Sequence, residues 1–198
     1  MGEIVVKEKP YDISWDEIHD VLWAAHAENR KAGLNMKAPG LPGSQMEALV
    51  GENGQCFVAL DGEKVIGTCS FKIETRNNWY VHHQPVAYCM LAGILPEYRG
   101  KGVYSQLLRL REQHIRQLHI KLMEMNTAEH NTAVQEALVK NGWRRVDFIS
   151  LKSPHYSVVM AKWLDGCPYS AWKCWWKYTI CKWKVKIKYK PGYIKRFG

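Results

Sequence analysis

Hydrophobic and polar positions follow two different periods along the first 164 residues. Residues 15–25 place apolar side chains three and four positions apart, which is the spacing of one helix face. Residues 55–60 and 64–73 are rich in apolar, β-branched and aromatic side chains, and the Asp61-Gly62 pair between them is a hairpin signal. This part of the chain is therefore expected to combine helices with paired strands.

The first predicted helix carries a start signal of its own. Ser14-Trp15-Asp16-Glu17 has the form of a capping box, in which Ser14 is the N-cap and Glu17 reaches back to it. The helix would bury one side, made of Trp15, Ile18, Val21, Leu22 and Ala25.

A nearly continuous apolar run from Val86 to Ala92 predicts a strand that is buried on both faces and ends at Leu95. The helix expected after it has an inward face of Val103, Leu107, Leu108, Ile115 and Leu118. The full expected order is a strand at 4–7, a helix that starts after Ser14 and stops at Gly33, a short helix at 44–50, strands at 55–60, 64–73 and 86–95, a helix at 102–118, a strand at 121–126, a helix at 131–141 closed by Gly142, and strands at 144–150 and 157–164. This order predicts an α/β protein with a mixed sheet and helices on its faces.

Length and hydropathy set the broad class. The 198 residues suit one domain, or one domain with an appendage. The first ten residues lack the apolar core of a signal peptide, and no apolar run approaches the roughly 18 residues of a membrane-spanning helix. A cytoplasmic location is the default expectation.

The six cysteines do not predict a metal site. Cys56, Cys69 and Cys89 fall in strand-like stretches, where packing thiols are common. Cys167, Cys174 and Cys181 recur every seven residues, which would place them near one face of a helix and differs from the close pairs of a zinc site.

Charge separates the last 34 residues from the rest. Residues 165–198 carry nine Lys and Arg against one acid, Asp165, and so hold +8 of the net charge of +9. We therefore expect two parts, a domain at 1–164 and a basic, Trp/Lys-rich extension at 165–198.

The extension has a repeating pattern. Lysine alternates strictly with apolar residues from Lys182 to Lys190, which is a strand pattern, and tryptophans are interleaved with lysines before it. Three interpretations stay open: an extra strand or helix packed on the domain, binding to an anionic membrane surface, or binding to nucleic acid. Nucleic acid is the least favoured because the extension has few arginines.

Residues 96–102 carry the clearest chemistry, because a strand runs into them and a helix follows. Gly100 and Gly102 have no Cβ, so neighbouring backbone N–H groups can point at one ligand. The helix N-terminus adds about half a positive charge, and Arg99 and Lys101 add full charges. A diphosphate suits such a turn. Ser105 replaces the third glycine of a dinucleotide-binding turn, and Gly102 replaces the Ser or Thr of a P-loop.

The segment Ile94-Leu95-Pro96-Glu97-Tyr98-Arg99-Gly100-Lys101-Gly102 resembles the cofactor motif of the GNAT superfamily of acyl-CoA N-acyltransferases. Arg99 and Gly102 match that motif, whereas Tyr104 occupies its last small position and departs from it. A second similarity lies downstream, in Asn131, Lys140 and the Gly142-Trp143 pair. The resemblance extends from residue 4 to about 164 and leaves out the extension.

The resemblance implies that acetyl-CoA, or another acyl-CoA, is the cosubstrate. It would bind between the strand ending at Leu95 and the strand at 121–126, and its pantetheine would pair with backbone near residues 92–94. One of those N–H groups would polarise the thioester carbonyl. The implied cofactor-binding residues are Ile94, Arg99, Gly100, Lys101, Gly102, Val103 and Tyr104, with Asn131 near the pantetheine.

The usual acid and base of the family are missing. Leu138 stands where a tyrosine acid is often found, and residues 84–95 contain no Asp or Glu. The substitutes considered are Glu124, His82 with His83, Tyr88, and the His155-Tyr156 pair, of which Glu124, His82 and Tyr156 are taken as the catalytic candidates. Each also has a structural interpretation, as a salt-bridged strand carboxylate, an exposed turn histidine and a plain turn residue.

The predicted function is transfer of an acetyl group from acetyl-CoA to an amine of a small molecule or sugar, by direct attack on the thioester. The alternative is a non-catalytic CoA-binding or scaffold protein with a membrane- or polyanion-binding tail. The expected partners are a small-molecule amine acceptor and an anionic membrane surface that would make the protein membrane-peripheral. A homodimer stays open, and neither nucleic acid nor a metal is expected.

Overall fold

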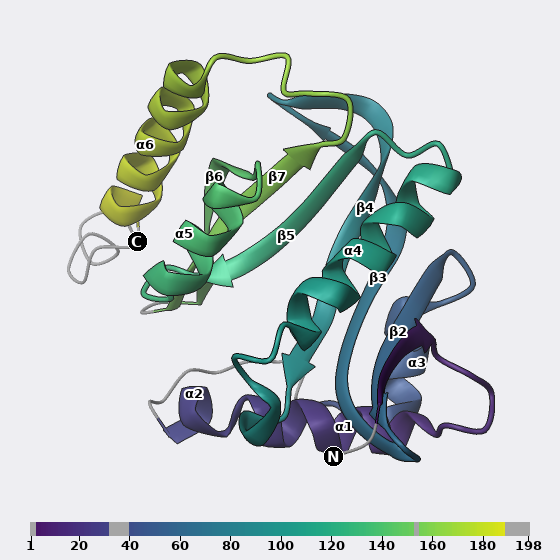
Figure 1. Ribbon diagram of the computed structural model, residues 1–198. Helices are drawn as coiled ribbons and strands as arrows, with labels where there is room; N and C mark the ends of the chain where they lie inside the picture. Colours follow the sequence, from purple (N-terminus) through teal and green to yellow (C-terminus); the bar gives the residue numbers. More distant parts are fainter. Residues whose placement is uncertain (1–2, 32–39, 153–154, 189–198) are drawn as a thin grey trace. The chain divides into compact units, whose positions relative to one another are not determined.

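The expected alternation of strands and helices is present in the computed structural model, which describes residues 3–31, 40–152 and 155–188 (Figure 1). The strands are β1 Ile4–Glu8, β2 Gly54–Asp61, β3 Lys64–Asn78, β4 Val81–Ile94, β5 Leu122–Ala128, β6 Arg144–Lys152 and β7 His155–Trp163. The helices are α1 Trp15–Ala25, α2 Ala27–Lys31, α3 Gly43–Val50, α4 Val103–Gln117, α5 Thr132–Lys140 and α6 Ala171–Lys188, with a 3-10 turn at Pro96–Tyr98. The strand order is β1-β2-β3-β4-β5-β7-β6, so the predicted α/β class with a mixed sheet is confirmed.

Contacts divide the chain into two compact units. Unit 1 contains Met1–Thr75 and Ala87–Ile120, and unit 2 contains Arg76–Val86 and Lys121–Gly198. The end of β3 and the start of β4 belong to unit 2, and the remainder of both strands belongs to unit 1. The predicted division at 164/165 stays a prediction.

The first helix of unit 1 starts as its sequence predicts. The Ser14 Oγ accepts a hydrogen bond from the Glu17 N–H at 3.2 Å, and the Glu17 carboxylate accepts one from the Ser14 N–H at 2.8 Å. The capping box is thus confirmed. The helix buries Ile18, Val21, Leu22 and Ala25, while Trp15 is half-buried.

Two glycines show how closely helices cover both faces of the unit 1 sheet. A Cβ on Gly93 of β4 would lie 2.8 Å from the Ala25 Cβ of α1. A Cβ on Gly67 of β3 would lie 2.3 Å from the Ile94 Cδ1 and 3.3 Å from the Leu107 Cδ1 of α4. Because neighbouring strand residues such as Gly93 and Ile94 face opposite ways, α1 and α4 cover opposite faces.

The inward face of α4 differs at three positions from the one predicted, and at the first of these Leu108 is only half-buried. Leu118 was expected inside but is 43% exposed, because α4 ends at Gln117 and the chain turns there. Arg111 takes an inward position instead, between Leu107 and Ile115, and is 1% exposed. The pattern search counted only apolar residues and therefore missed this buried arginine.

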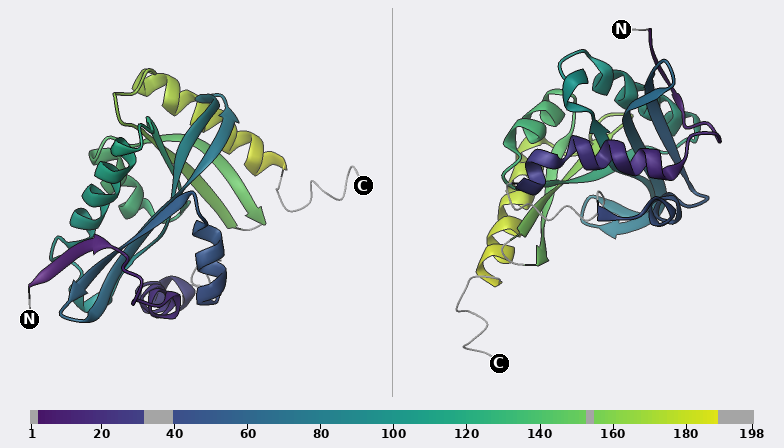
Figure 2. Two further views of the ribbon diagram at one scale, coloured as in Figure 1. Left: turned by 90° about the vertical axis from the view of Figure 1, so that its right-hand side faces the viewer. Right: turned by 90° about the horizontal axis from the view of Figure 1, so that it is seen from below.

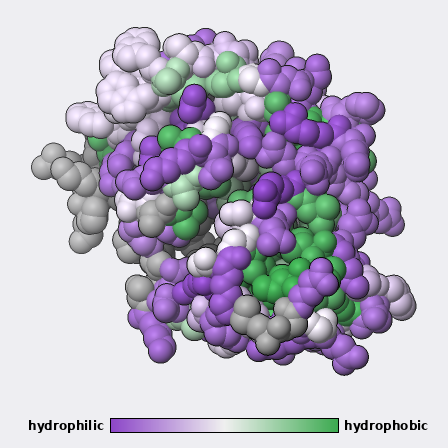
Figure 3. Space-filling model, in the orientation of Figure 1, coloured by the Kyte–Doolittle hydropathy of each residue, from purple (hydrophilic) through white to green (hydrophobic). Residues whose placement is uncertain are grey.

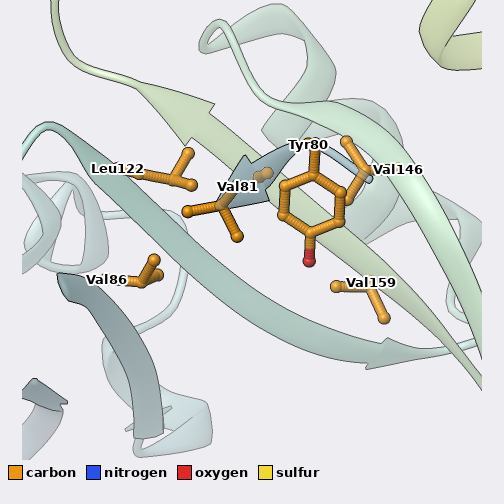
Figure 4. Close-up of a cluster of buried hydrophobic side chains, with 7 residues drawn as sticks. Tyr80, Val81, Val86, Leu122, Val146 and Val159 are labelled. Carbon is orange, nitrogen blue, oxygen red and sulfur yellow. The ribbon is translucent and has the colours of Figure 1, made fainter. Parts of the chain in front are cut away.

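Unit 2 is built on antiparallel pairing of β7 with both β5 and β6. Its core gathers side chains from β4, β5, β6, β7 and the turn before β4 (Figure 4), and consists of Tyr80, Val81, Val86, Leu122, Val146, Val159 and Ala161. The Trp79 indole N–H donates to the Val146 carbonyl at 2.9 Å, which fixes the β3–β4 turn onto β6.

The extension forms a helix where its alternating pattern predicted a strand. Residues 171–188 make α6, which packs along β6 (Figures 1 and 2). Its inner face has helical spacing: Cys174 is buried, and Cys181 follows seven residues later, as the cysteine spacing indicated. The alternation predicted a strand to Lys190, and residues 189 and 190 lie outside the described residues. For 182–188 the strand prediction was wrong, because packing on β6 favours the helix.

Candidate active site

The turn after β4 has the open backbone that the sequence suggested. Gly100 and Gly102 both have a φ of +76°, a left-handed conformation that strains any residue with a Cβ. Gly102 is the N-cap of α4 and offers no side-chain acceptor to the first N–H groups of that helix. A Cβ on either glycine would meet no other atom within 4 Å, so the space in front of them is open. The turn therefore presents helix N–H donors to an accessible space that an anion can enter.

The side chains around this turn are held by neighbours. The Arg99 Nη2 donates to the Ala25 carbonyl at 2.7 Å, and its Nη1 lies 3.2 Å from the Glu28 carboxylate. The Lys101 Nζ lies 4.8 Å from the centre of the Tyr98 ring. Arg99 thus joins the turn to the end of α1 and to Glu28 of α2.

The start of α4 is partly enclosed. Val103 is buried, and Tyr104, the residue that departs from the family motif, is half-buried. Burial raises the pKa of the Tyr104 phenol, so this side chain stays neutral near pH 7. Tyr104 therefore contributes bulk and a neutral hydroxyl, and the positive character of the turn comes from Arg99, Lys101 and the helix terminus.

A histidine that the sequence search missed lies beside the end of β4. His26 is the C-cap of α1, and its Nε2 lies 3.0 Å from the Ala92 carbonyl oxygen. Its Nδ1 lies 3.2 Å from the Asn29 amide nitrogen. The geometry fits Nε2–H donating to Ala92 and Nδ1 accepting from Asn29. Burial lowers the pKa of His26, as do the charges of Arg30 and Arg99, so the imidazole is neutral at pH 7.

The backbone defines which edge of β4 this histidine contacts. The Leu95 N–H donates to the Ile66 carbonyl of β3 at 2.9 Å. Because polar backbone groups alternate along a strand, Ala92 and Ile94 point to the edge away from β3. Leu91 just before them has a φ of +49°, a left-handed value that interrupts the regular strand. His26 therefore sits at an irregular stretch of β4, on the edge opposite β3.

Glu124 of β5 lies in unit 2 and has partners on both oxygens. Its Oε2 accepts a hydrogen bond from the Tyr80 hydroxyl at 2.5 Å, and its Oε1 lies 3.7 Å from the Arg76 Nε. The carboxylate is 7% exposed. Burial, and then the charge of Glu124, raises the pKa of Tyr80 well above its usual range. The arrangement is a buried polar cluster.

His82 begins β4 and lies at the surface of unit 2. Its Nδ1 lies 2.8 Å from the Asn77 Oδ1, and its ring contacts that of His83. It also borders a pocket of about 470 Å³. The lining of that pocket combines aromatic side chains with polar and charged ones, among them Trp79, Tyr80, Trp163, Tyr169, Gln84, Lys121 and Asp165.

Tyr156 and Asn131 have structural contacts of their own in unit 2. The half-buried Tyr156 stacks on Phe148 with ring centres 5.5 Å apart. Asn131 is the N-cap of α5, and its Oδ1 accepts from the Val134 N–H at 3.4 Å. Glu124, His82 and Tyr156 therefore have different neighbours, whereas the predicted cofactor residues from Ile94 to Tyr104 are contiguous.

Comparison with known proteins identifies the family. A family model for the acetyltransferase (GNAT) family matches residues 15–143, which include β4, the glycine turn and α5. The chain belongs to this GNAT acetyltransferase family. No curated protein matches the chain.

Solved GNAT structures share the fold of this chain. An acetyltransferase from Streptococcus agalactiae 2603 is 19% identical, with a TM-score of 0.62 over 81% of this chain and 98% of its own. A GNAT-family acetyltransferase from Staphylococcus aureus MU50 is 14% identical, with a TM-score of 0.63 over 82% and 99%. An aminoglycoside 6'-N-acetyltransferase complexed with coenzyme A is 12% identical, with a TM-score of 0.60 over 80% and 96%. Membership of the family supports acyltransferase activity in general.

The described residues hold neither a metal-binding cluster nor a membrane-spanning helix. Among residues 3–31, 40–152 and 155–188, no group of three or more His, Cys, Asp or Glu side chains could hold a metal ion. Within the same ranges, no helix is both long and apolar enough to cross a membrane.

Proposed function

We propose that this GNAT protein transfers an acetyl group from acetyl-CoA, or from another acyl-CoA, to an amine of a small molecule or sugar. The observation that carries the proposal is the turn at Gly100 and Gly102, whose left-handed glycines open the start of α4 to an anion. The residues from Ile94 to Tyr104 would hold the pyrophosphate end of the cosubstrate. The turn lies inside the range that matches the family model.

In this proposal, the edge of β4 that faces away from β3 receives the pantetheine. Ala92 and Ile94 direct their backbone groups to that edge, and one of their N–H groups would polarise the thioester carbonyl. Such a donor contributes roughly 3 kcal/mol to transition-state stabilisation in studied enzymes. When bound, the acyl-CoA supplies the acyl group: the acceptor nitrogen bonds to the carbonyl carbon, the C–S bond breaks, and the thiolate takes up a proton.

We propose His26 as the group that accepts the acceptor's proton, in place of the three candidates drawn from sequence. Its Nδ1 carries the lone pair, which the Asn29 amide must release before Nδ1 takes the proton, and its lowered pKa leaves the ring unprotonated at neutral pH. The Nε2–H bond to Ala92 would hold the ring in place and stabilise the imidazolium once Nδ1 is protonated. The contact with Ala92 places the imidazole next to the backbone that would bind the thioester.

The substitution His26→Gln tests this role. Glutamine keeps a donor for the Ala92 carbonyl but cannot accept a proton at neutral pH, so kcat should fall by about 10²–10⁴ while acetyl-CoA affinity changes little. His19→Gln on the same helix is the matched control and should retain activity. Thiol release from acetyl-CoA is measured against a panel of amines and amino sugars. Undiminished kcat in His26→Gln would remove His26 from the mechanism without affecting the cosubstrate proposal.

Cosubstrate binding is tested separately, with two glycines of similar conformation. Gly102→Ala and Gly62→Ala both place a Cβ at a positive φ in open space, so each should cost about 1–2 kcal/mol of stability. Only Gly102→Ala should also weaken acetyl-CoA binding, by about fivefold or more, because only Gly102 begins α4. Equal acetyl-CoA affinity in both variants, measured by calorimetry, would contradict the assignment of the turn.

The second candidate function is a CoA-binding protein without turnover. Leu138, at the position where the family often has a tyrosine acid, is 4% exposed and belongs to the core. The two functions differ in one measurement: tight acetyl-CoA binding without thiol release for any acceptor in the panel would favour the non-catalytic protein.

A further inference from the structure

One face of α6 is fixed against unit 2. Cys174 is buried, and the Tyr178 ring meets the Phe148 ring edge-on with centres 6.2 Å apart. The Lys182 Nζ lies 3.0 Å from the Glu129 carboxylate at the end of β5. These contacts, at positions four residues apart along the helix, determine which side points away from the protein.

The opposite face carries a row of large apolar side chains, which we name the tryptophan stripe. It consists of Trp172, Trp176, Trp183 and Ile187, which are 67%, 46%, 70% and 40% exposed. Their spacing of four, seven and four residues places them in line, over about 22 Å of helix at 1.5 Å per residue. Figure 3 shows pale side chains of intermediate hydropathy gathered over α6 among hydrophilic surface. A row of this size is unusual on a surface that faces only water.

A row of lysines runs beside the stripe. Each stripe residue is followed directly by a lysine, at Lys173, Lys177, Lys184 and Lys188, and all four are exposed. One residue corresponds to about 100° around a helix, so these lysines form a parallel row. The helix contains six lysines and no acidic residue. The outer surface of α6 is therefore aromatic along one line and positively charged along the next.

We infer that α6 lies flat on an anionic membrane surface, with the tryptophan stripe in the interface and the lysine row on the lipid headgroups. Tryptophan concentrates at membrane interfaces, and a helix with one apolar and one basic face lies in the plane of the interface. Anionic headgroups attract the positive charges of the lysine row. This surface is independent of acyl transfer.

The same features argue against two other occupants. A symmetric dimer that buried the stripe would bring the lysine rows of two copies close together, and like charges would oppose it. Nucleic acid readers generally rely on arginine as well as on aromatic stacking, and α6 contains no arginine. Both occupants are distinguishable from a membrane by experiment.

Co-sedimentation of the full chain with vesicles tests the inference. The protein should bind vesicles of phosphatidylcholine mixed with phosphatidylglycerol, and should bind pure phosphatidylcholine vesicles at least tenfold more weakly. A triple variant with Trp172→Gln, Trp176→Gln and Trp183→Gln should lose binding, whereas Trp23→Gln, which removes an exposed tryptophan of α1, should not. A double variant with Lys177→Gln and Lys184→Gln should bind about 25-fold more weakly, at about fivefold per charge. Lys121→Gln with Lys140→Gln is its charge-matched control.

Three results would overturn the inference. The first is absence of wild-type binding to the anionic vesicles, with folding verified by circular dichroism. The second is binding to a mixed-sequence RNA or DNA at least as tight as to vesicles, which would assign the face to nucleic acid. The third is a dimer in sedimentation velocity that the tryptophan variant dissociates, which would assign the face to a second copy.

Discussion

A buried carboxylate in unit 2 and a half-buried imidazole in unit 1 differ in how their partners hold them. Glu124 in unit 2 receives the Tyr80 hydroxyl on one oxygen and faces Arg76 with the other. His26 in unit 1 donates from one ring nitrogen to a backbone carbonyl and receives an amide on the other. The Glu124 carboxylate is engaged by the Tyr80 hydroxyl and by the Arg76 cation. The His26 imidazole, in contrast, has its lone pair engaged only by a neutral donor, the Asn29 amide.

This difference separates a structural role from a chemical one. A carboxylate whose oxygens are both engaged in a buried cluster stabilises that cluster, and releasing it for proton transfer would leave its partners unpaired. A neutral imidazole held by a backbone carbonyl is oriented without losing its capacity to accept a proton.

Glu124→Ala should lower the free energy of unfolding by about 3 kcal/mol, because the buried Tyr80 hydroxyl and Arg76 lose their acceptor. Urea denaturation measures this. Glu136→Ala, on the exposed side of α5, is the control and should change stability by less than about 0.5 kcal/mol. A hundredfold loss of kcat in a Glu124→Ala protein of normal stability would reverse the contrast and make Glu124 the base.

Tyr80→Phe should cost about 2 kcal/mol of stability, since it removes a hydrogen bond to a charged group and keeps the ring packing against Trp79 and Trp163. Tyr156→Phe, which keeps the ring stacked on Phe148, should cost less. Equal stabilities of the two variants in thermal denaturation would mean that the Tyr80 hydroxyl does not support the cluster.

The pH dependence should follow His26. The pKa of His26 is lowered from 6.5, so protonation of His26 should leave kcat unchanged above pH 6.5. Below the folded-state pKa, kcat should fall about tenfold per pH unit. His26→Gln should lack this acidic limb, and an unchanged limb would assign the titration to another group.

The same shift affects stability. The unfolded chain binds a proton at His26 more readily than the folded chain, so acidification favours unfolding. The contribution of His26 to the free energy of unfolding is fully present above pH 6.5 and is lost as the pH falls from 6.5 to the folded-state pKa. The difference between the urea midpoints of wild type and His26→Gln should therefore change with pH only in that range.

Asn29→Ala should have the smallest effect, about two- to fivefold on kcat, because it removes the amide that orients the His26 Nδ1 but leaves the bond to Ala92. Steady-state kinetics with a saturating acceptor measure it. A loss as large as that of His26→Gln would show that orientation through Asn29, and not the bond to Ala92, controls the imidazole.

Local signals predicted much of the fold. The capping box at Ser14 and Glu17, the hairpin at Gly62 and the glycine turn at 100–102 each depend on residues close together in the chain. The family resemblance from residue 94 onward led to the correct family for the same reason, since its motif is contiguous.

The features that sequence missed depend on distant contacts. His26 meets Ala92 across 66 positions, and Glu124 meets Tyr80 across 44. Nothing in the sequence around His26 or Glu124 indicates that His26 contacts a backbone carbonyl and that Glu124 contacts a side-chain hydroxyl. In the extension, the strict alternation over 182–190 indicated a strand, while Trp172, Trp176 and Trp183 have helical spacing. Packing on β6 decides between the strand period and the helix period.

The division of the chain into units has a consequence during translation. Unit 1 has all of its residues once Ile120 has been made, but the 76–86 segment within that stretch belongs to unit 2. Tyr80 and Val86 cannot pack into their cluster until Leu122, Val146 and Val159 have been synthesised. At about 5–20 residues per second, the forty or so residues still to come take roughly 2 to 8 seconds. During that interval a nascent chain would expose this hairpin to chaperones.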